Sequence, residues 1–372
     1  MRRYLISWIL FLAAGLVPAA QAADPFLSPP GVAERGMGGA MTAGSGSLAA
    51  IWHNPATLVD GDTRVELEWQ SAPDRREDGT LRAGSNAWFF GASWVNRDKW
   101  YGTVATGVAA YTPHNMKFWS EQTGEPRSAF GRTNITTQVV GVPYAVEFDE
   151  LGLALGAVGE IVAVDPSGSD IRIQRADGDV SEADFDDEQH FGVSGAMGAR
   201  LRVHDDGPTR VDLGAVYRPG ATAGARLDLD SGAAERLMPD KPGGWDIGVR
   251  WRHRFEGERA LSAQAHYGST HWGSAGHLRR DALAVSYTVP FDATAALRSG
   301  ERTLRFAYSR ARPHEDRGWM DWPRATAIAA GIGFDFVEGV HIDLVAELRD
   351  EERSDHDDDD SWFTGVNFGF PF

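Results

Sequence analysis

The sequence predicts an all-β fold: a transmembrane antiparallel β-barrel of about 14 strands, with an N-terminal hatch segment inside the lumen. Three observations predict it. Apolar and polar residues alternate along segments of about 10–13 residues, which suits membrane strands of about 9–11 residues better than sandwich strands of about 5–6. Short and long connections follow one another in turn. Aromatic residues gather near the segment ends, as in the girdles of membrane barrels.

Residues 1–22 have the pattern of a signal peptide. Arg2 and Arg3 give a positive start, residues 4–17 form an apolar run, and Ala20-Gln21-Ala22 matches a small-residue cleavage site. The run is short for a membrane helix, which needs about 20 residues, so an uncleaved anchor is the less favoured alternative. We expect the chain to be exported.

Composition excludes several classes of protein. The chain has no cysteine, which excludes a disulfide framework, a thiolate metal site, a cysteine nucleophile and a lipid-attached cysteine. A formal charge of −17 argues against nucleic acid as a partner, because phosphate binding needs clustered Lys and Arg. No second apolar stretch approaches the length of a spanning helix. A periplasmic or secreted β protein and an outer-membrane barrel remain.

The alternation is clear in residues 244–255, where Ile247 and Trp251 share one face of a strand and Arg250 and Arg252 share the other. A soluble sandwich would turn the apolar face to a core, whereas a barrel turns it to lipid and turns the charges to the lumen. The length of the strands favours the barrel, and so does the alternation of short with long connections between them.

Fourteen strands are predicted, an even number that closes a barrel with both ends on one side. They cover residues 64–72, 86–96, 101–112, 135–148, 152–164, 190–204, 210–219, 244–255, 259–268, 281–291, 302–312, 325–337, 339–349 and 361–372. The long connections are expected at 113–133, 165–189, 220–243, 269–280, 310–324 and 350–360. A closed wall leaves no strand edge unpaired.

The segment 23–63 is expected to fold back into the lumen as a hatch, ahead of the barrel domain at 64–372. A barrel of this size is too wide for wall side chains alone to fill. Glycines in the segment allow close contact with a curved wall. Residues such as Leu48, Ile51 and Trp52 are too apolar for a solvated tail, although a disordered tail is the alternative.

The run 31–58, GVAERGMGGAMTAGSGSLAAIWHNPATL, contains the motif Asn54-Pro55-Ala56. Asn54 can cap a helix or hydrogen-bond locally, and Pro55 pre-sets the turn that follows. The run resembles the N-terminal hatch of the FadL/TodX-type family of outer-membrane long-chain fatty acid and hydrocarbon transporters. The strand count and the terminal Phe372 are similar to that family as well.

The resemblance implies a monomeric barrel in the outer membrane of a Gram-negative bacterium, with the hatch inside. Its expected function is passive transport of small hydrophobic molecules, either long-chain fatty acids or neutral or aromatic hydrocarbons, with lateral release in some members. The alternative is a barrel with an assembly, adhesion or structural role. The expected partners are a hydrophobic ligand, outer-membrane lipid and lipopolysaccharide, and the assembly machinery that reads Phe372.

Two candidate sites follow from this interpretation. Gly141 and Pro143 interrupt a run of good strand formers, and proline has no N–H for the ladder, so we predict a lateral gate there. A single bulge that only sets curvature is the alternative. The second site is an outer patch that captures ligand, formed by apolar residues in two long connections: Met116, Phe118, Trp119, Trp319, Met320 and Trp322. Ordinary girdle packing would also account for these residues.

A search for catalytic and metal-binding residues favours neither role. Gly192-Val193-Ser194-Gly195 lacks the spacing of a nucleophile elbow, and no histidine spacing specifies a triad. The acidic run 354–360, SDHDDDD, lacks the ligand order of a calcium loop, so a solvated rim is favoured over calcium binding. No enzyme activity, cofactor or metal is expected.

Overall fold

A computed structural model gives the structure of the chain. It describes residues 30–44, 46–71, 86–100, 102–120, 128–174, 180–185, 189–221, 227–229, 234–235, 241–271, 277–291, 300–313, 324–336, 339–353 and 356–372. The signal peptide predicted for residues 1–22 lies outside these ranges. Among the described residues, no helix has the length and apolar content to cross a membrane.

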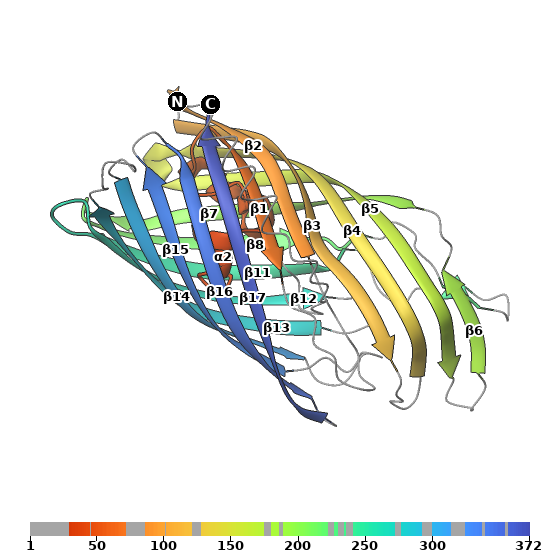
Figure 1. Cartoon of the computed structure of the whole chain (residues 1–372). Helices are drawn as coiled ribbons and strands as arrows, with labels where there is room; N and C mark the ends of the chain where they lie inside the picture. Colours follow the sequence, from red (N-terminus) through yellow and green to blue (C-terminus); the bar gives the residue numbers. More distant parts are fainter. Residues whose placement is uncertain are drawn as a thin grey trace, which may run out of the picture.

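The wall is a closed antiparallel barrel of 14 strands, which confirms the predicted fold (Figure 1). The wall strands are β1 (Arg64–Ser71), β2 (Asn86–Lys99), β3 (Gly102–Ser120), β4 (Ser128–Phe148), β5 (Leu153–Gln174), β7 (His190–Asp205), β8 (Thr209–Arg218), β11 (Gly243–Arg254), β12 (Ala260–His271), β13 (His277–Phe291), β14 (Gly300–Pro313), β15 (Arg324–Phe336), β16 (His341–Arg353) and β17 (His356–Pro371). Three short strands, β6 (Val180–Phe185), β9 (Leu227–Leu229) and β10 (Ala234–Glu235), extend the sheet beside β5.

Closure is made by β1, which pairs antiparallel with β2 on one side and with β17 on the other. Trp69 lies opposite Trp88 of β2 and Val366 of β17. We call the end of the barrel where β1 begins and β17 ends the terminal end, and the opposite end the loop end. Because every wall strand has two neighbours, the barrel has no free edge along its closed part.

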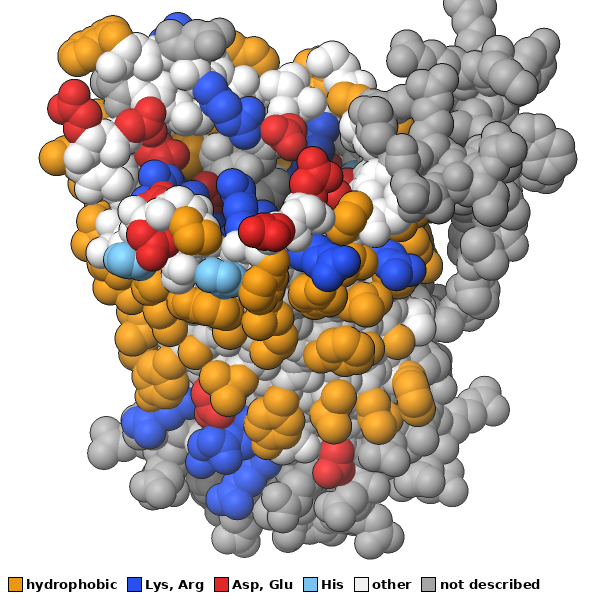
Figure 2. All heavy atoms as spheres, turned by 90° about the vertical axis from the view of Figure 1, so that its left-hand side faces the viewer, with side chains coloured by type: hydrophobic (Ala, Val, Ile, Leu, Met, Phe, Trp, Pro, Cys, Tyr) orange, Lys and Arg blue, Asp and Glu red, His pale blue; other side chains and the backbone are white. Residues whose placement is uncertain are grey.

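The two faces of the wall differ as the alternation predicts. Large apolar side chains such as Val142, Ile161 and Phe306 are more than half exposed on the outer face. On the face drawn in Figure 2, hydrophobic side chains form a band across the wall, with charged side chains nearer its two ends. Charged residues such as Arg200 and Asp343 are fully buried on the inner face. The outer band suits lipid, and the inner face is polar.

Several predicted long connections are shorter than expected, because the strands continue past the apolar band. Residues 113–120 and 128–133 belong to β3 and β4, and residues 165–174 belong to β5, although all were predicted as loop. Beyond the lipid both faces of a strand meet water. The apolar alternation on which the prediction rested therefore stops before the strand does.

Candidate functional site

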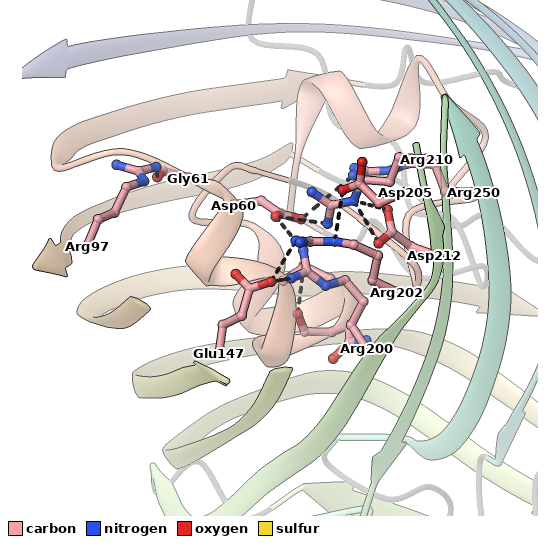
Figure 3. Close-up of polar contacts among 12 residues, drawn as sticks. Asp60, Gly61, Arg97, Glu147, Arg200, Arg202, Asp205, Arg210, Asp212 and Arg250 are labelled. Carbon is pink, nitrogen blue, oxygen red and sulfur yellow. Dashed lines mark hydrogen bonds and ion pairs between the residues drawn. The ribbon is translucent and has the colours of Figure 1, made fainter. Parts of the chain in front are cut away.

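Residues 30–44 and 46–61 lie inside the barrel and contact its inner face; we call them the interior segment (Figures 1 and 3). It contains helices α2 (Val32–Arg35) and α3 (Ala50–His53) and the 3-10 helix η1 (Pro55–Asp60). Its apolar side chains are buried, and those of Leu48, Ile51 and Trp52 are at most 2% exposed. The interior segment is packed as tightly as a protein core.

The start of the interior segment is held by carboxylates of β1. The backbone N–H groups of Gly31 and Val32 donate to the Glu68 carboxylate at 2.7 and 2.8 Å. The Leu48 N–H donates to both oxygens of Glu66 at 3.1 Å. These acids therefore satisfy N–H groups that would otherwise be buried without partners.

The motif Asn54-Pro55-Ala56 joins the interior segment to the wall. Asn54 is the N-cap of η1, and its side-chain oxygen accepts from the Ala56 N–H at 3.1 Å. Its amide nitrogen donates to the carbonyl of Thr42 at 2.7 Å and to that of Ala199 in β7 at 3.0 Å. Asn54 is fully buried. The predicted cap is confirmed, and the sequence did not indicate the bond to the wall.

Glycines of the wall make room for the motif. A Cβ added at Gly198 would collide with the Asn54 side chain, and one added at Gly156 would collide with the Ala56 backbone. From the sequence we expected glycines of the interior segment to allow its close contact with the wall. In the structure, glycines of the wall strands allow this close contact as well.

A cluster of ions fixes the other end of the interior segment (Figure 3). Asp60, the last residue of η1, forms an ion pair with the fully buried Arg200 of β7. Arg210 and Arg250 approach Asp60 at 3.6 and 3.9 Å. Burial alone raises the pKa of Asp60, but these three guanidiniums outweigh it and lower the pKa to about 2. The carboxylate therefore stays ionised at neutral pH.

Two wall carboxylates complete this cluster. Glu147 accepts from Arg200 at 2.6 Å and from Arg202 at 2.7 Å. Asp212, which is fully buried, accepts from Arg250 at 3.1 Å. Charges of both signs thus neutralise one another inside the barrel.

The middle of the interior segment packs against an aromatic and cationic site on the wall. Trp52 meets Tyr111 of β3 edge to face, with ring centroids 6.2 Å apart. Arg218 donates to the Trp52 carbonyl at 2.8 Å and lies 5.5 Å from the centroid of its ring. Lys241 lies 5.3 Å from that ring and pairs with Glu160. Trp52 is accordingly 2% exposed, held by an aromatic ring and two cations of the wall.

His53 follows Trp52 and remains uncharged. Its Nε2 lies 3.1 Å from the carbonyl of Pro30, which accepts the bond. Burial, with Arg218 nearby, lowers the pKa of His53 to about 3. The imidazole is therefore neutral at ordinary pH.

The wall is interrupted beside Pro143. Strands β3 and β4 pair at Thr106 with Tyr144 and again at Ala109 with Gly141, but the two pairs between them are absent. The register is the same on both sides of this gap. Because proline has no N–H, a missing ladder bond at this point has a direct chemical cause.

The interior segment covers this interruption with apolar side chains. Leu48 and Ile51 pack against inward-facing glycines of the wall: a Cβ on Gly141 would lie 2.7 Å from Cδ1 of Ile51, and one on Gly107 would lie 3.1 Å from Cδ1 of Leu48. Gly141, singled out from the sequence, thus faces Ile51, and Pro143, two residues further along β4, is also buried.

A pocket lies beside α2, among residues near the loop ends of β12 to β16. Its polar lining includes Arg35 of α2, Arg280 of β13, Arg310 of β14 and Arg349 of β16. Small residues such as Ala325 and Ala327 line the rest. The four arginines are far apart in sequence, and sequence reasoning missed them as a group. Arg35 belongs to α2, and Arg310 alternates in step with the exposed Phe306 and Tyr308 of β14, so no single sequence pattern marks the four.

The structure describes only some of the residues predicted to capture ligand. Met116, Phe118 and Trp119 lie on β3 rather than in a loop, while residues 319–322 lie outside the described residues. Ser194 donates its hydroxyl to the carbonyl of Pro219 at 3.2 Å. Within the described ranges, no group of three or more His, Asp or Glu residues is placed to hold a metal.

No protein-family model matches the chain, and no curated protein matches its sequence. Solved structures do match. CymD, a monoaromatic hydrocarbon channel, is 14% identical with a TM-score of 0.61, over 92% of this chain and 97% of that one. A Pseudomonas aeruginosa FadL homologue is 13% identical with a TM-score of 0.59, over 94% and 98%. The P. putida toluene transporter TodX is 14% identical with a TM-score of 0.56, over 93% and 99%.

Proposed function

We propose that this chain, which has the fold of the FadL/TodX-type channels, is an outer-membrane channel for small hydrophobic molecules. The observation that carries the proposal is the interior segment, which occupies a polar lumen and covers an interruption of the wall. The similar structures are named as a hydrocarbon channel, a FadL homologue and a toluene transporter, and their names support the same class of cargo.

The outer membrane is the location that this architecture supports. The band of exposed apolar side chains gives the barrel a lipid-facing surface, and closure satisfies the backbone of its wall strands in hydrocarbon. The terminal end would face the periplasm, with the longer strands β3, β4 and β5 reaching outward. The signal peptide expected at residues 1–22 agrees with export to this membrane.

In this proposal the interior segment is a hatch that closes the lumen. Its bonds to Glu66 and Glu68 and its ion pair with Arg200 hold both of its ends on the wall. Because Arg200 is fully buried, displacing the hatch would take away one of its two carboxylate partners. A closed hatch would therefore be the stable state, and small hydrophilic solutes would be excluded.

Lateral release is the finer part of the proposal. A hydrophobic molecule could leave the lumen beside Pro143, where two ladder pairs are missing between β3 and β4. Leu48 and Ile51 would then cover an apolar exit toward the bilayer. The alternative, a bulge that only sets wall curvature, predicts that restoring the ladder leaves transport unchanged.

Uptake by whole cells tests the proposed function. Labelled toluene and labelled oleate are offered to cells whose outer membrane carries the chain and to matched cells without it. A channel raises the initial uptake rate of at least one compound. Equal rates for both compounds, with the barrel folded in the membrane, would support the alternative of an assembly, adhesion or structural role.

A further inference from the structure

The outer face of β14 changes character close to the loop end. Phe306 and Tyr308 are exposed aromatic side chains of the lipid-facing band. Residues two apart on a strand share a face, so Arg310 and Arg312 follow them on the outer face. The outer face of this strand therefore turns from apolar to positively charged between Tyr308 and Arg310.

Cross-strand pairing brings a third arginine and one carboxylate to the same place. Arg312 lies opposite Arg279 of β13, and Arg310 lies opposite Asp281. The Asp281 carboxylate lies 3.1 Å from Arg310 and 3.4 Å from Arg312. We call these four residues the outer basic patch. Like charges directly opposite each other destabilise a strand pair, and here three guanidiniums share the patch with one carboxylate.

The outer basic patch lies at the depth of lipid head groups. Arg310 is two residues beyond Tyr308, which is about 7 Å along the strand. The polar layer on each side of a bilayer is about 5–8 Å thick. The exposed rings of Trp245 and Tyr267, 5.6 Å apart, lie beside the patch, and Tyr267 is opposite Asp281. Such aromatic side chains are typical of the membrane interface. In Figure 2, several Lys or Arg side chains gather below the hydrophobic band, toward the loop end.

Arg310 and Arg312 can bind a further anion. Their side chains are 37% and 48% exposed. Each donates to Asp281 through one nitrogen, Nη2, although a guanidinium carries five N–H donors. Nε of Arg310 has no hydrogen-bond partner among the described residues. An anion from the membrane could therefore be bound without displacing Asp281.

A phosphate group attached to a lipid fits this place. Guanidinium groups bind phosphate through paired N–H donors. A phosphate monoester carries about −1.5 to −2 charges at neutral pH, which matches the two positive charges that the patch has in excess. The acyl chains of such a lipid would lie along the exposed side chains of Leu283 and Tyr308, directly below the arginines.

We propose that the outer basic patch binds a phosphate group of lipopolysaccharide and holds one lipid molecule at a fixed place on the wall. The proposal rests on the orientation given with the proposed function, in which the loop end faces outward and meets the outer leaflet. A free phosphate would meet the same arginines but would leave the apolar strip below them unused. The border between the arginines and the lipid-facing band therefore favours the lipid.

The test compares a phosphorylated lipid with its phosphate-free form. Binding of fluorescent lipid A to the purified full chain in detergent micelles is measured beside binding of lipid A from which both phosphates have been removed. EDTA is present throughout, so that divalent cations do not bridge the lipid to carboxylates of the chain. We expect the phosphorylated form to bind roughly tenfold more tightly, with a preference that falls as salt rises.

The variant Arg310→Gln/Arg312→Gln should lose this preference and bind both lipids alike. Arg259→Gln/Arg302→Gln is the matched control. It removes the same charge from two exposed arginines at the terminal end, one in the turn after β11 and one on the outer face of β14. The control should keep the preference of the parent chain. Barrel folding of each variant is checked by heat-resistant migration on gels.

Equal binding of the two lipids by the parent chain would overturn the proposal, and so would a preference that survives in Arg310→Gln/Arg312→Gln. Displacement of lipid A by inorganic phosphate, beyond that caused by sodium chloride of equal ionic strength, would assign the arginines to a free anion and would also overturn it. Failure of the proposed function has a different signature. In that case neither toluene nor oleate enters cells faster with the chain than without it, whatever the purified chain binds.

Discussion

Removing the charge of Asp60 should loosen the hatch without unfolding the barrel. In the variant Asp60→Asn the shape of the side chain is kept, but the fully buried Arg200 loses one of its two carboxylate partners. Breaking one side of a buried ion pair costs about 3 kcal/mol or more. Because Asp60 belongs to the interior segment, this cost falls on its docking to the wall.

A loss of about 3 kcal/mol shifts the balance between docked and undocked hatch by roughly a hundredfold. Single-channel recordings in planar bilayers would show this as a large rise in the time spent in conducting states. Asp62→Asn is the matched control, because Asp62 is exposed and forms a surface ion pair with Arg97 at 3.2 Å. Such a pair contributes about 1 kcal/mol at most. Equal recordings from the two variants would refute the reasoning.

The same carboxylate predicts how the parent channel responds to pH. The pKa of Asp60 is lowered from its ordinary 3.8 to about 2. Its contribution to docking is therefore fully present above pH 3.8 and is lost as the pH falls through 2. Between pH 8 and pH 5 this group should leave the conductance unchanged. Channels that open within that range would show that another group controls the hatch.

Three further predictions test other parts of the site. Pro143→Val restores an N–H to β4 and should slow uptake, while the barrel stays as stable as the parent or becomes more stable. Gly141 is left unchanged, because a valine there would collide with Ile51. An unchanged uptake rate would place the exit elsewhere. Gly198→Val should displace Asn54 and raise ion conductance. Gly159→Val is the control and should leave conductance unchanged, because a side chain there meets open space. Equal conductance of the two variants would show that the Asn54 contact does not hold the hatch. Alanine at Met116, Phe118, Trp119, Trp319, Met320 and Trp322 together should weaken ligand binding with normal heat-resistant migration, and intact binding would exclude a capture patch.

The wall could be predicted from the sequence because lipid imposes a strict rule on it. A strand that faces hydrocarbon on one side must alternate, as residues 244–255 do, and the predicted strand agrees with β11. The same rule fails past the apolar band, where β3, β4 and β5 continue with water on both faces. Strand ends are therefore less predictable than strand existence.

The contacts of the interior segment could be predicted only in part. A local signal was present for Asn54, whose side chain caps the helix that follows it. Its bond to Ala199 joins residues 145 apart, and the ion pair of Asp60 with Arg200 joins residues 140 apart. No local pattern reports such partners, because strand register around the whole barrel decides which side chains meet.

The ion conductance of a chain that lacks residues 31–58 tests the central claim most directly. The parent chain, reconstituted in planar bilayers, should conduct almost no small ions. The deletion variant should keep heat-resistant migration, since its fourteen wall strands remain, and should form a stably open channel. A folded deletion variant that stays as closed as the parent would contradict the account, because the interior segment would then not be what closes the lumen.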